Sequence, residues 1–246
     1  MNIRRIFPSS HYALLSLFYL IGTEVWFALS RWPVLLFFII VAVLIIGIIL
    51  IRSEEGSDFH PTQAILPTLA AFGFTAFAIY LPQTFFLHIY FIICSIIFFA
   101  ILKYGAKQAW PTWNLTISLV VLFACTASVI GWRFYLYTSV GYIVAILFPV
   151  ISLTAFQSLV RYTRSIQETA LLSLALGLVL TETVWILQFL PMNFIVQSGL
   201  IVSLYYASMQ IIASTYERRL TRRFMIELAI AGAVGIAFLL ATAHWS

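Results

Sequence analysis

Charged residues are scarce in this chain: they make up 9% of its 246 residues, whereas hydrophobic residues make up 63%. A soluble domain usually carries about 25% charged residues. A water-soluble fold of this length has no means of hiding so much apolar surface, so the composition excludes a soluble protein and predicts that lipid surrounds most of the chain. Exposed loops and sheet edges leave backbone groups unsatisfied in hydrocarbon. We therefore predict an all-α polytopic transmembrane helix bundle.

Residue types that carry particular chemistry are also rare. Asp58 is the only aspartate, which excludes the aspartate-rich motifs with which membrane transferases hold a metal and a diphosphate. The only lysines, Lys103 and Lys107, lie in a predicted loop, which excludes a buried Schiff-base lysine. Cys94 and Cys125 lie in predicted spans outside any paired motif, as buried apolar residues do. We expect no cofactor, no metal site and no catalytic residues, because no catalytic motif is present either.

What the chain does contain is a series of nine hydrophobic stretches separated by short gaps. Each is about 20 residues long, which is the length that crosses a bilayer as a helix. No hydrophilic module interrupts the series, so we predict a single transmembrane domain over residues 1–246. The predicted spans are 11–29, 32–51, 63–82, 84–102, 112–131, 134–155, 168–190, 192–213 and 225–243.

The basic residues predict the orientation of these spans. If the gaps alternate between inside and outside from an inside N-terminus, only Arg31 and Arg133, of the 13 lysines and arginines, fall outside. Cytoplasmic loops carry such an excess of basic residues, so we predict a cytoplasmic N-terminus and, after nine spans, an outside C-terminus. The net charge of +5 follows from this pattern and does not indicate nucleic-acid binding. The expected partners are membrane lipid and proteins at cytoplasmic loops, the last of which contains Arg218, Arg219, Arg222 and Arg223.

Two glutamates are the most informative polar residues. Glu24 and Glu182 each lie within a span, near its outer end, and each follows a threonine, Thr23 or Thr181. A carboxylate at that depth is costly and usually faces a bundle interior, a water cavity or a partner. One hypothesis is a cation or proton site with the threonine hydroxyls as neighbouring ligands. The alternative is structural, in which each glutamate bonds to a neighbouring helix or pairs with an arginine at the outer rim.

Several other residues are candidates for a site. Arg31 and Arg133 interrupt the charge pattern, which indicates either an anionic-substrate site or snorkelling beside interfacial tryptophans. His88 is the only histidine well inside a span, where it either lines a cavity or is a packed, hydrogen-bonded residue. Tyr206 and Gln210 are four residues apart and share a helix face, which either lines a cavity or forms interhelical hydrogen bonds.

Threonines recur at nearly equal intervals along the chain. Thr23, Thr75, Thr126 and Thr181 each lie near the outer end of the first helix of a predicted hairpin. A repeated hairpin would explain the interval, but any chain with evenly spaced spans and turns has a similar period. Both explanations stay open at this point.

The segment Thr181–Pro191, TETVWILQFLP, followed by Leu204–Tyr206, LYY, resembles a stretch found in uncharacterised multi-pass integral membrane proteins of small-genome bacteria. The resemblance covers the last third of the chain. It implies a multi-pass protein of the bacterial plasma (inner) membrane and brings no activity with it.

Three functional hypotheses follow. The first is a small transporter or channel with a cation- or proton-linked site near Glu24 and Glu182. The second is a non-catalytic membrane subunit or scaffold that docks partners through its inside loops. The third is an intramembrane enzyme that acts on lipid. Only the first requires the two carboxylates to meet at a hydrated site.

Overall fold

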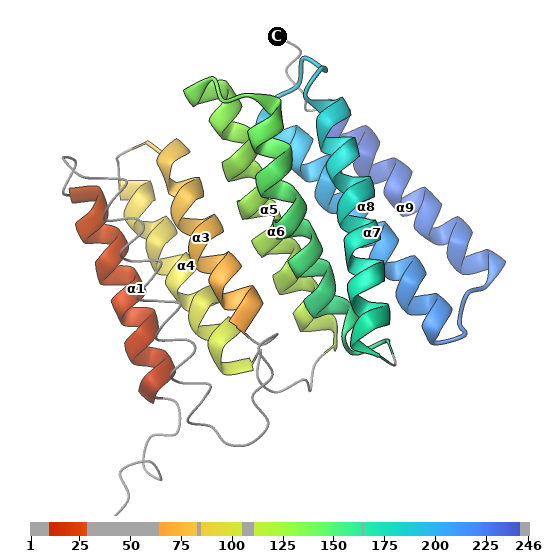
Figure 1. The fold of residues 1–246 in the computed structure, drawn as a ribbon. Helices are drawn as coiled ribbons and strands as arrows, with labels where there is room; N and C mark the ends of the chain where they lie inside the picture. The colour runs from red at the N-terminus through yellow and green to blue at the C-terminus, as the bar shows by residue number, and fades with distance from the viewer. Residues whose placement is uncertain (1–9, 29–63, 83–84, 105–110, 164, 242–246) are drawn as a thin grey trace, which may run out of the picture. The chain divides into compact units, whose positions relative to one another are not determined.

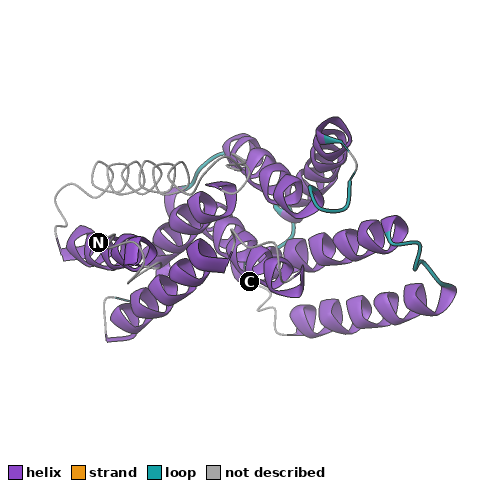
Figure 2. Ribbon diagram, turned by 90° about the horizontal axis from the view of Figure 1, so that it is seen from below, coloured by secondary structure: helices purple, strands orange, loops and turns teal. Residues whose placement is uncertain are grey.

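The protein is described from a computed structural model, in which every regular element of the described residues is a helix (Figures 1 and 2). The chain forms two compact units, Met1–Ile117 and Ser118–Ser246. Each unit is described by itself. The predicted span 32–51 and Arg31 lie outside the described residues, and the single domain over 1–246 stays a prediction. The described residues are 10–28, 64–82, 85–104, 111–163 and 165–241.

The first unit contains α1 (Ser10–Ala28), α3 (Ile65–Phe77), the short 3-10 helix η3 (Ala78–Tyr80) and α4 (Phe85–Tyr104). These helices coincide with the predicted spans 11–29, 63–82 and 84–102. Both α1 and α3 pack against α4. Helices α1 and α4 are antiparallel, because Ser16 contacts Ser95 whereas Glu24, further along α1, contacts His88, earlier on α4.

Small hydroxyl side chains join α1 to α4. The Ser16 hydroxyl donates to the Ser95 carbonyl at 2.7 Å, the Ser95 hydroxyl donates to the Ser16 carbonyl at 2.9 Å, and the two hydroxyls are 2.8 Å apart. One turn away the fully buried Tyr19 ring stacks on Phe98, with 5.1 Å between centroids. Serine at a crossing lets two backbones approach closely, where lipid supplies no hydrophobic drive for association.

The second unit contains α5 (Pro111–Leu136), α6 (Val140–Leu159), α7 (Ile166–Leu187), α8 (Phe194–Tyr216) and α9 (Arg222–Ala241). The boundary between the two units falls within α5. Helix α6 packs along α7, α7 against α8, and α8 against α9. Three of these helices coincide with the predicted spans 168–190, 192–213 and 225–243.

Caps in the sequence explain where several of these helices begin and end. The Ser165 hydroxyl accepts a hydrogen bond from the Glu168 amide at the start of α7, and the Asn193 side chain accepts one from the Ile195 amide at the start of α8. Such caps satisfy amides that a helix leaves unpaired at its first turn. At the end of α8, the amide of Arg219 bonds to the carbonyl of Ser214, with Arg218 at a positive φ of 55°. This is the hydrogen-bond pattern of a Schellman motif.

One predicted boundary is wrong. We predicted an outside turn at 131–133 and a span at 134–155, whereas α5 continues to Leu136 and α6 starts at Val140. No glycine or proline breaks the helix after Gly131, so the aromatic residues Phe134 and Tyr135 continue it. The turn instead falls at 137–139, where Tyr137 has a positive φ of 51°. Arg133 is therefore in the last turn of a helix and not in a loop.

A glycine allows close contact between α6 and α7. Gly177 of α7 lies against Ser152 of α6 so closely that a Cβ built on the glycine would meet the Ser152 Oγ at 2.0 Å. Both residues are buried. Small residues at such crossings are typical of helices packed in lipid.

The distribution of polarity in the second unit is that of a membrane protein. The outer face of α7 is largely apolar, with Leu171, Leu178 and Trp185 more than half exposed, although Glu182 also lies on it. Its inner face instead holds buried small and polar residues, such as Ser173 and Thr181. A soluble protein rarely exposes a continuous apolar helix face, so this face is suited to lipid.

Candidate functional site

The predicted site residue Glu24 meets His88 in the first unit. The His88 Nδ1 lies 2.9 Å from Oε1 and 2.8 Å from Oε2 of Glu24, so one ring nitrogen binds both carboxylate oxygens. The two side chains come from antiparallel helices, α1 and α4, and are 34% and 59% exposed respectively. Because Nδ1 is held by the carboxylate, Nε2 is the nitrogen that is left to exchange a proton with its surroundings.

The threonines proposed as neighbouring ligands are turned inward. Thr23, Thr75, Thr126 and Thr181 are all buried, and each donates its hydroxyl proton to the carbonyl four residues earlier in its own helix, at 2.6–2.9 Å. Threonine commonly makes this bond within helices. The four recurring threonines therefore share one structural role, a hydrogen bond within their own helix. That Thr23 and Thr181 also act as ligands of a site stays a hypothesis.

Glu182 has a different environment from Glu24. It lies on the exposed face of α7, and its carboxylate has neither a hydrogen bond nor an ion pair with any described residue. Glu24 belongs to the first unit and Glu182 to the second. The convergence of the two carboxylates on one hydrated site stays a prediction.

Sequence reasoning missed a polar chain that begins at Arg133. The Arg133 Nη1 donates to the Gln188 Oε1 at 3.2 Å, the Gln188 Nε2 donates to the Gln197 Oε1 at 2.8 Å, and the Gln197 Nε2 donates to the Met192 carbonyl at 3.0 Å. Gln188 is 5% exposed and Gln197 1%. We refer to these four residues as the arginine–glutamine chain. It ties the end of α5 to the turn between α7 and α8.

The structure shows a buried hydroxyl contact on α8 beside the face that the sequence singles out. Tyr206 is exposed and Gln210 half-buried, and neither side chain forms a hydrogen bond with another described residue. Tyr205 is fully buried instead, and its hydroxyl donates to the Ser158 hydroxyl at 3.0 Å, which in turn lies 3.5 Å from Ser118. Hydroxyls of α5, α6 and α8 thus meet inside the second unit. Tyr206 and Gln210 as residues that line a cavity stay a prediction.

The basic cluster after α8 lies on the surface. Arg218, Arg219, Arg222 and Arg223 are all exposed. Two of them have acidic partners: Arg219 lies 3.5 Å from Glu217, and Arg223 lies 2.8 Å from Glu227, one helical turn further on. Exposed pairs of this kind contribute little to stability, so the cluster remains accessible to lipid or to a partner.

No arrangement suited to a metal is found in the part of the chain that the structure describes: no three histidine, cysteine or acidic side chains come together there. Cys94 and Cys125 are both buried, and no disulfide joins them. Among the described residues, the Glu24–His88 pair thus offers two ligand side chains, which is fewer than a closed zinc site requires.

The helices that carry these residues define the class of protein. Within the described residues, α4, α5, α6, α7 and α8 are long and apolar enough to cross a membrane. Together with the apolar outer face of α7, they indicate a helical membrane protein.

Residues 111–242, which run from the start of α5 through α9, match the family described as "Protein of unknown function (DUF5656)". This segment is more than half of the 246 residues, and the chain belongs to that family. No curated protein and no solved structure matches the chain. The matched segment contains both stretches that carried the resemblance to uncharacterised membrane proteins, while the bacterial origin and the multi-pass topology stay predictions.

Proposed function

We propose that this membrane protein is a small transporter or channel whose activity is linked to protons, and that Glu24 and His88 form its proton site. The observation that carries the proposal is the contact of the His88 Nδ1 with both Glu24 oxygens, at 2.8–2.9 Å. Acidic residues and histidines within membrane helices are rare, usually face a bundle interior or a water cavity, and include the residues of proton relays.

The chemistry of the pair supports this use. An imidazole is the side chain that changes its charge most readily around neutral pH. A proton taken up at the His88 Nε2 makes the ring cationic, and the Glu24 carboxylate beside Nδ1 stabilises that charge. Loss of the proton leaves a neutral ring that still donates from Nδ1 to Glu24. The pair can therefore cycle between two states without either group leaving its position.

The topology that we propose for this activity is the one that the charge pattern predicts. The chain crosses the bacterial plasma membrane nine times, with the N-terminus in the cytoplasm and the C-terminus outside. The Glu24–His88 pair then lies in the outer half of the membrane. A tag at the C-terminus is expected to be accessible only from outside the cell, and accessibility only from the cytoplasm would contradict this topology.

The decisive experiment is proton flux into liposomes that contain the purified full-length chain and an internal pH-sensitive dye. We expect flux in the wild type, and we expect its loss in Glu24→Gln and in His88→Gln. Glu227→Gln is the matched control, because it removes a carboxylate that lies on the surface of α9 and pairs with Arg223. Absence of flux in the wild type, or unchanged flux in both site variants, would contradict the proposal.

Glu182 is tested separately. If the two carboxylates act together, Glu182→Gln lowers the flux as Glu24→Gln does. If Glu182 instead faces lipid or a partner, its variant retains the flux of the wild type, and the proton site consists of the first unit's pair alone.

A second candidate function is a non-catalytic membrane subunit, and α9 favours it. Helix α9 packs against α8, and a Cβ built on Gly232 or Gly235 meets no atom within 4 Å. Its small residues are thus open to another helix, and the exposed arginines before it are open to a partner. Copurification of one defined protein with the wild type, together with an absence of flux, would favour this function over transport.

A further inference from the structure

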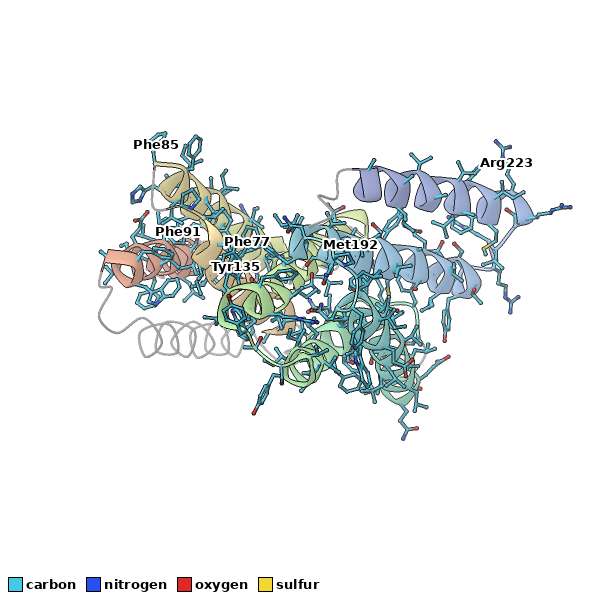
Figure 3. All side chains as sticks on the ribbon, turned by 90° about the horizontal axis from the view of Figure 1, so that it is seen from above. Phe77, Phe85, Phe91, Tyr135, Met192 and Arg223 are labelled. Carbon is cyan, nitrogen blue, oxygen red and sulfur yellow. The ribbon has the colours of Figure 1, made fainter. Side chains whose placement is uncertain are left out.

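We infer that Arg133 is the centre of a binding site for the phosphate group of an anionic membrane lipid, at the end of the second unit where α5 ends and α8 begins. This inference is independent of the proton site, because it rests on residues of the second unit alone. Figure 3 labels two residues of this end, Tyr135 on α5 and Met192 in the turn between α7 and α8.

Arg133 is held in place by neutral groups. Its Nη1 donates to the Gln188 carbonyl oxygen at 3.2 Å, and Gln188 is itself fixed by Gln197, whose amide donates to the Met192 carbonyl. Both glutamines are nine-tenths buried or more. A guanidinium has five N–H donors, and the chain uses one of them. The buried amides therefore orient the arginine without neutralising it.

No acidic partner cancels the charge of Arg133 among the described residues. Helices α5, α6 and α8 contain no aspartate or glutamate between residues 111 and 216, and α7 contains only Glu168 and Glu182. Glu168 lies in the first turn of α7, far along the helix from Gln188, and bonds to Tyr216. Glu182 lies on the exposed face of α7, and no ion pair joins it to Arg133. The positive charge at this end is thus uncompensated within the unit.

The backbone adds to the positive potential. Helix α8 begins at Phe194, beside the arginine–glutamine chain, and the N-terminus of a helix carries the positive end of its dipole. Phe194 also contacts the residues that follow Arg133, with ring centroids 6.1 Å from Phe134 and 6.0 Å from Tyr135. The helix start and the guanidinium therefore lie at the same place and favour the same ligand, an anion.

The surroundings indicate that this anion is part of a lipid. The residues that follow Arg133 expose apolar surface: Tyr135 is 58%, Leu136 65% and Tyr137 90% exposed. Phe189, just after the end of α7, is 71% exposed. Tyrosines and arginines placed next to exposed aliphatic side chains are typical of the membrane interface, where headgroups meet acyl chains. A planar guanidinium binds phosphate oxygens through two parallel hydrogen bonds. The shared chemistry is thus a phosphate, and the apolar rim favours one that carries acyl chains.

The test measures the apparent melting temperature of the purified full-length chain in neutral detergent, because a ligand that binds only the folded state raises it. Phosphatidylglycerol, phosphatidylcholine and inorganic phosphate are titrated separately. We expect phosphatidylglycerol to raise the melting temperature of the wild type. We expect Arg133→Gln to weaken the binding of this lipid about 10- to 100-fold, because the variant loses charge-assisted hydrogen bonds to the phosphate. Arg223→Gln, which removes the same charge from the surface of α9, is the matched control and is expected to bind like the wild type.

Two further variants separate a built site from general attraction. Gln188→Leu leaves the charge of Arg133 but removes the group that orients it, so it weakens binding at a built site and has no effect on long-range attraction. Gln188→Glu places a carboxylate beside the guanidinium and is expected to abolish binding of the anion. The carboxylate still accepts from the Arg133 Nη1, although it no longer donates to the Gln197 Oε1.

The outcomes are distinct. Stabilisation by phosphatidylglycerol that depends on both Arg133 and Gln188 supports the lipid site. If inorganic phosphate also raises the melting temperature, and this effect depends on Arg133 and Gln188, the site binds phosphate but its ligand is a soluble anion and not a lipid. If Arg133→Gln and Arg223→Gln lose binding equally, or if Gln188→Leu binds like the wild type, the attraction is general and the inference is wrong.

Discussion

The contact between Gly177 and Ser152 allows a prediction whose size follows from the structure. In an open helix the change of glycine to alanine stabilises the protein by about 1 kcal/mol. At Gly177 the new Cβ would lie 2.0 Å from the Ser152 Oγ, 3.1 Å from its Cβ and 3.3 Å from its Cα. The hydroxyl can rotate away, but the two carbons cannot, and both are closer than the roughly 3.5–4.0 Å that carbon atoms prefer. Helices α6 and α7 must therefore separate.

Overpacking of this kind usually costs about 1–3 kcal/mol. Gly232→Ala on α9 is the matched control, because a Cβ there meets nothing within 4 Å. Both variants gain the same helix propensity, so we expect Gly177→Ala to unfold with a free energy about 1–3 kcal/mol lower than that of Gly232→Ala. Unfolding in mixed micelles of rising denaturing-detergent content, followed by circular dichroism, measures this difference.

A compensating change identifies the cause. Ser152→Gly removes the two side-chain atoms that the new methyl group would meet, so Gly177→Ala/Ser152→Gly is expected to recover most of the loss. The Ser152 hydroxyl has no hydrogen-bond partner in the described residues, so its removal leaves no group unpaired. Equal stability of Gly177→Ala and Gly232→Ala would refute the close contact between the two helices.

Three smaller predictions concern the hydrogen bonds and the backbone of helix ends and crossings. Ser95→Ala is expected to destabilise the first unit by about 1 kcal/mol, because it removes the hydrogen bond that Ser95 donates to Ser16. A double-mutant cycle with Ser16→Ala is expected to show coupling between the two serines, and additive losses of stability would contradict this contact. Arg218→Gly is expected to stabilise the protein by about 1 kcal/mol, because glycine adopts a positive φ without strain; a lower unfolding free energy would contradict it. Ser165→Ala removes the cap of α7 and is expected to cost about 1 kcal/mol, measured by the same unfolding, whereas Ser165→Asp should retain the stability of the wild type.

The positions of the helices could be predicted from the sequence because span length and hydrophobicity dominate in lipid. The predicted spans 84–102 and 192–213 differ by only a few residues from α4 (Phe85–Tyr104) and α8 (Phe194–Tyr216). The predicted turn at 131–133 is wrong, because α5 continues through Arg133 to Leu136. An arginine beside an interface extends its side chain toward the polar region, so it need not end the helix.

The partners of the site residues could not be predicted. Glu24 and His88 are far apart in the sequence, and their contact depends on α1 packing against α4. Gln188 and Gln197 were missed as a site because one uncharged amide in an apolar run gives no periodic signal. Two glutamines on either side of Pro191, close to the end of a predicted hairpin, are the only hint that the sequence offers.

The arginine–glutamine chain has a consequence for how the second unit is kept in register. A guanidinium only donates hydrogen bonds and a backbone carbonyl only accepts them, so the two amides between them have a single permitted direction. Apolar helices in lipid can otherwise slide along each other with little change in contact energy. A slip of α8 by one turn, about 5.4 Å, would break the bond between Gln188 and Gln197 and leave buried amides unpaired. The direction of the hydrogen bonds in the arginine–glutamine chain thus sets the axial alignment of the apolar helices α5, α7 and α8.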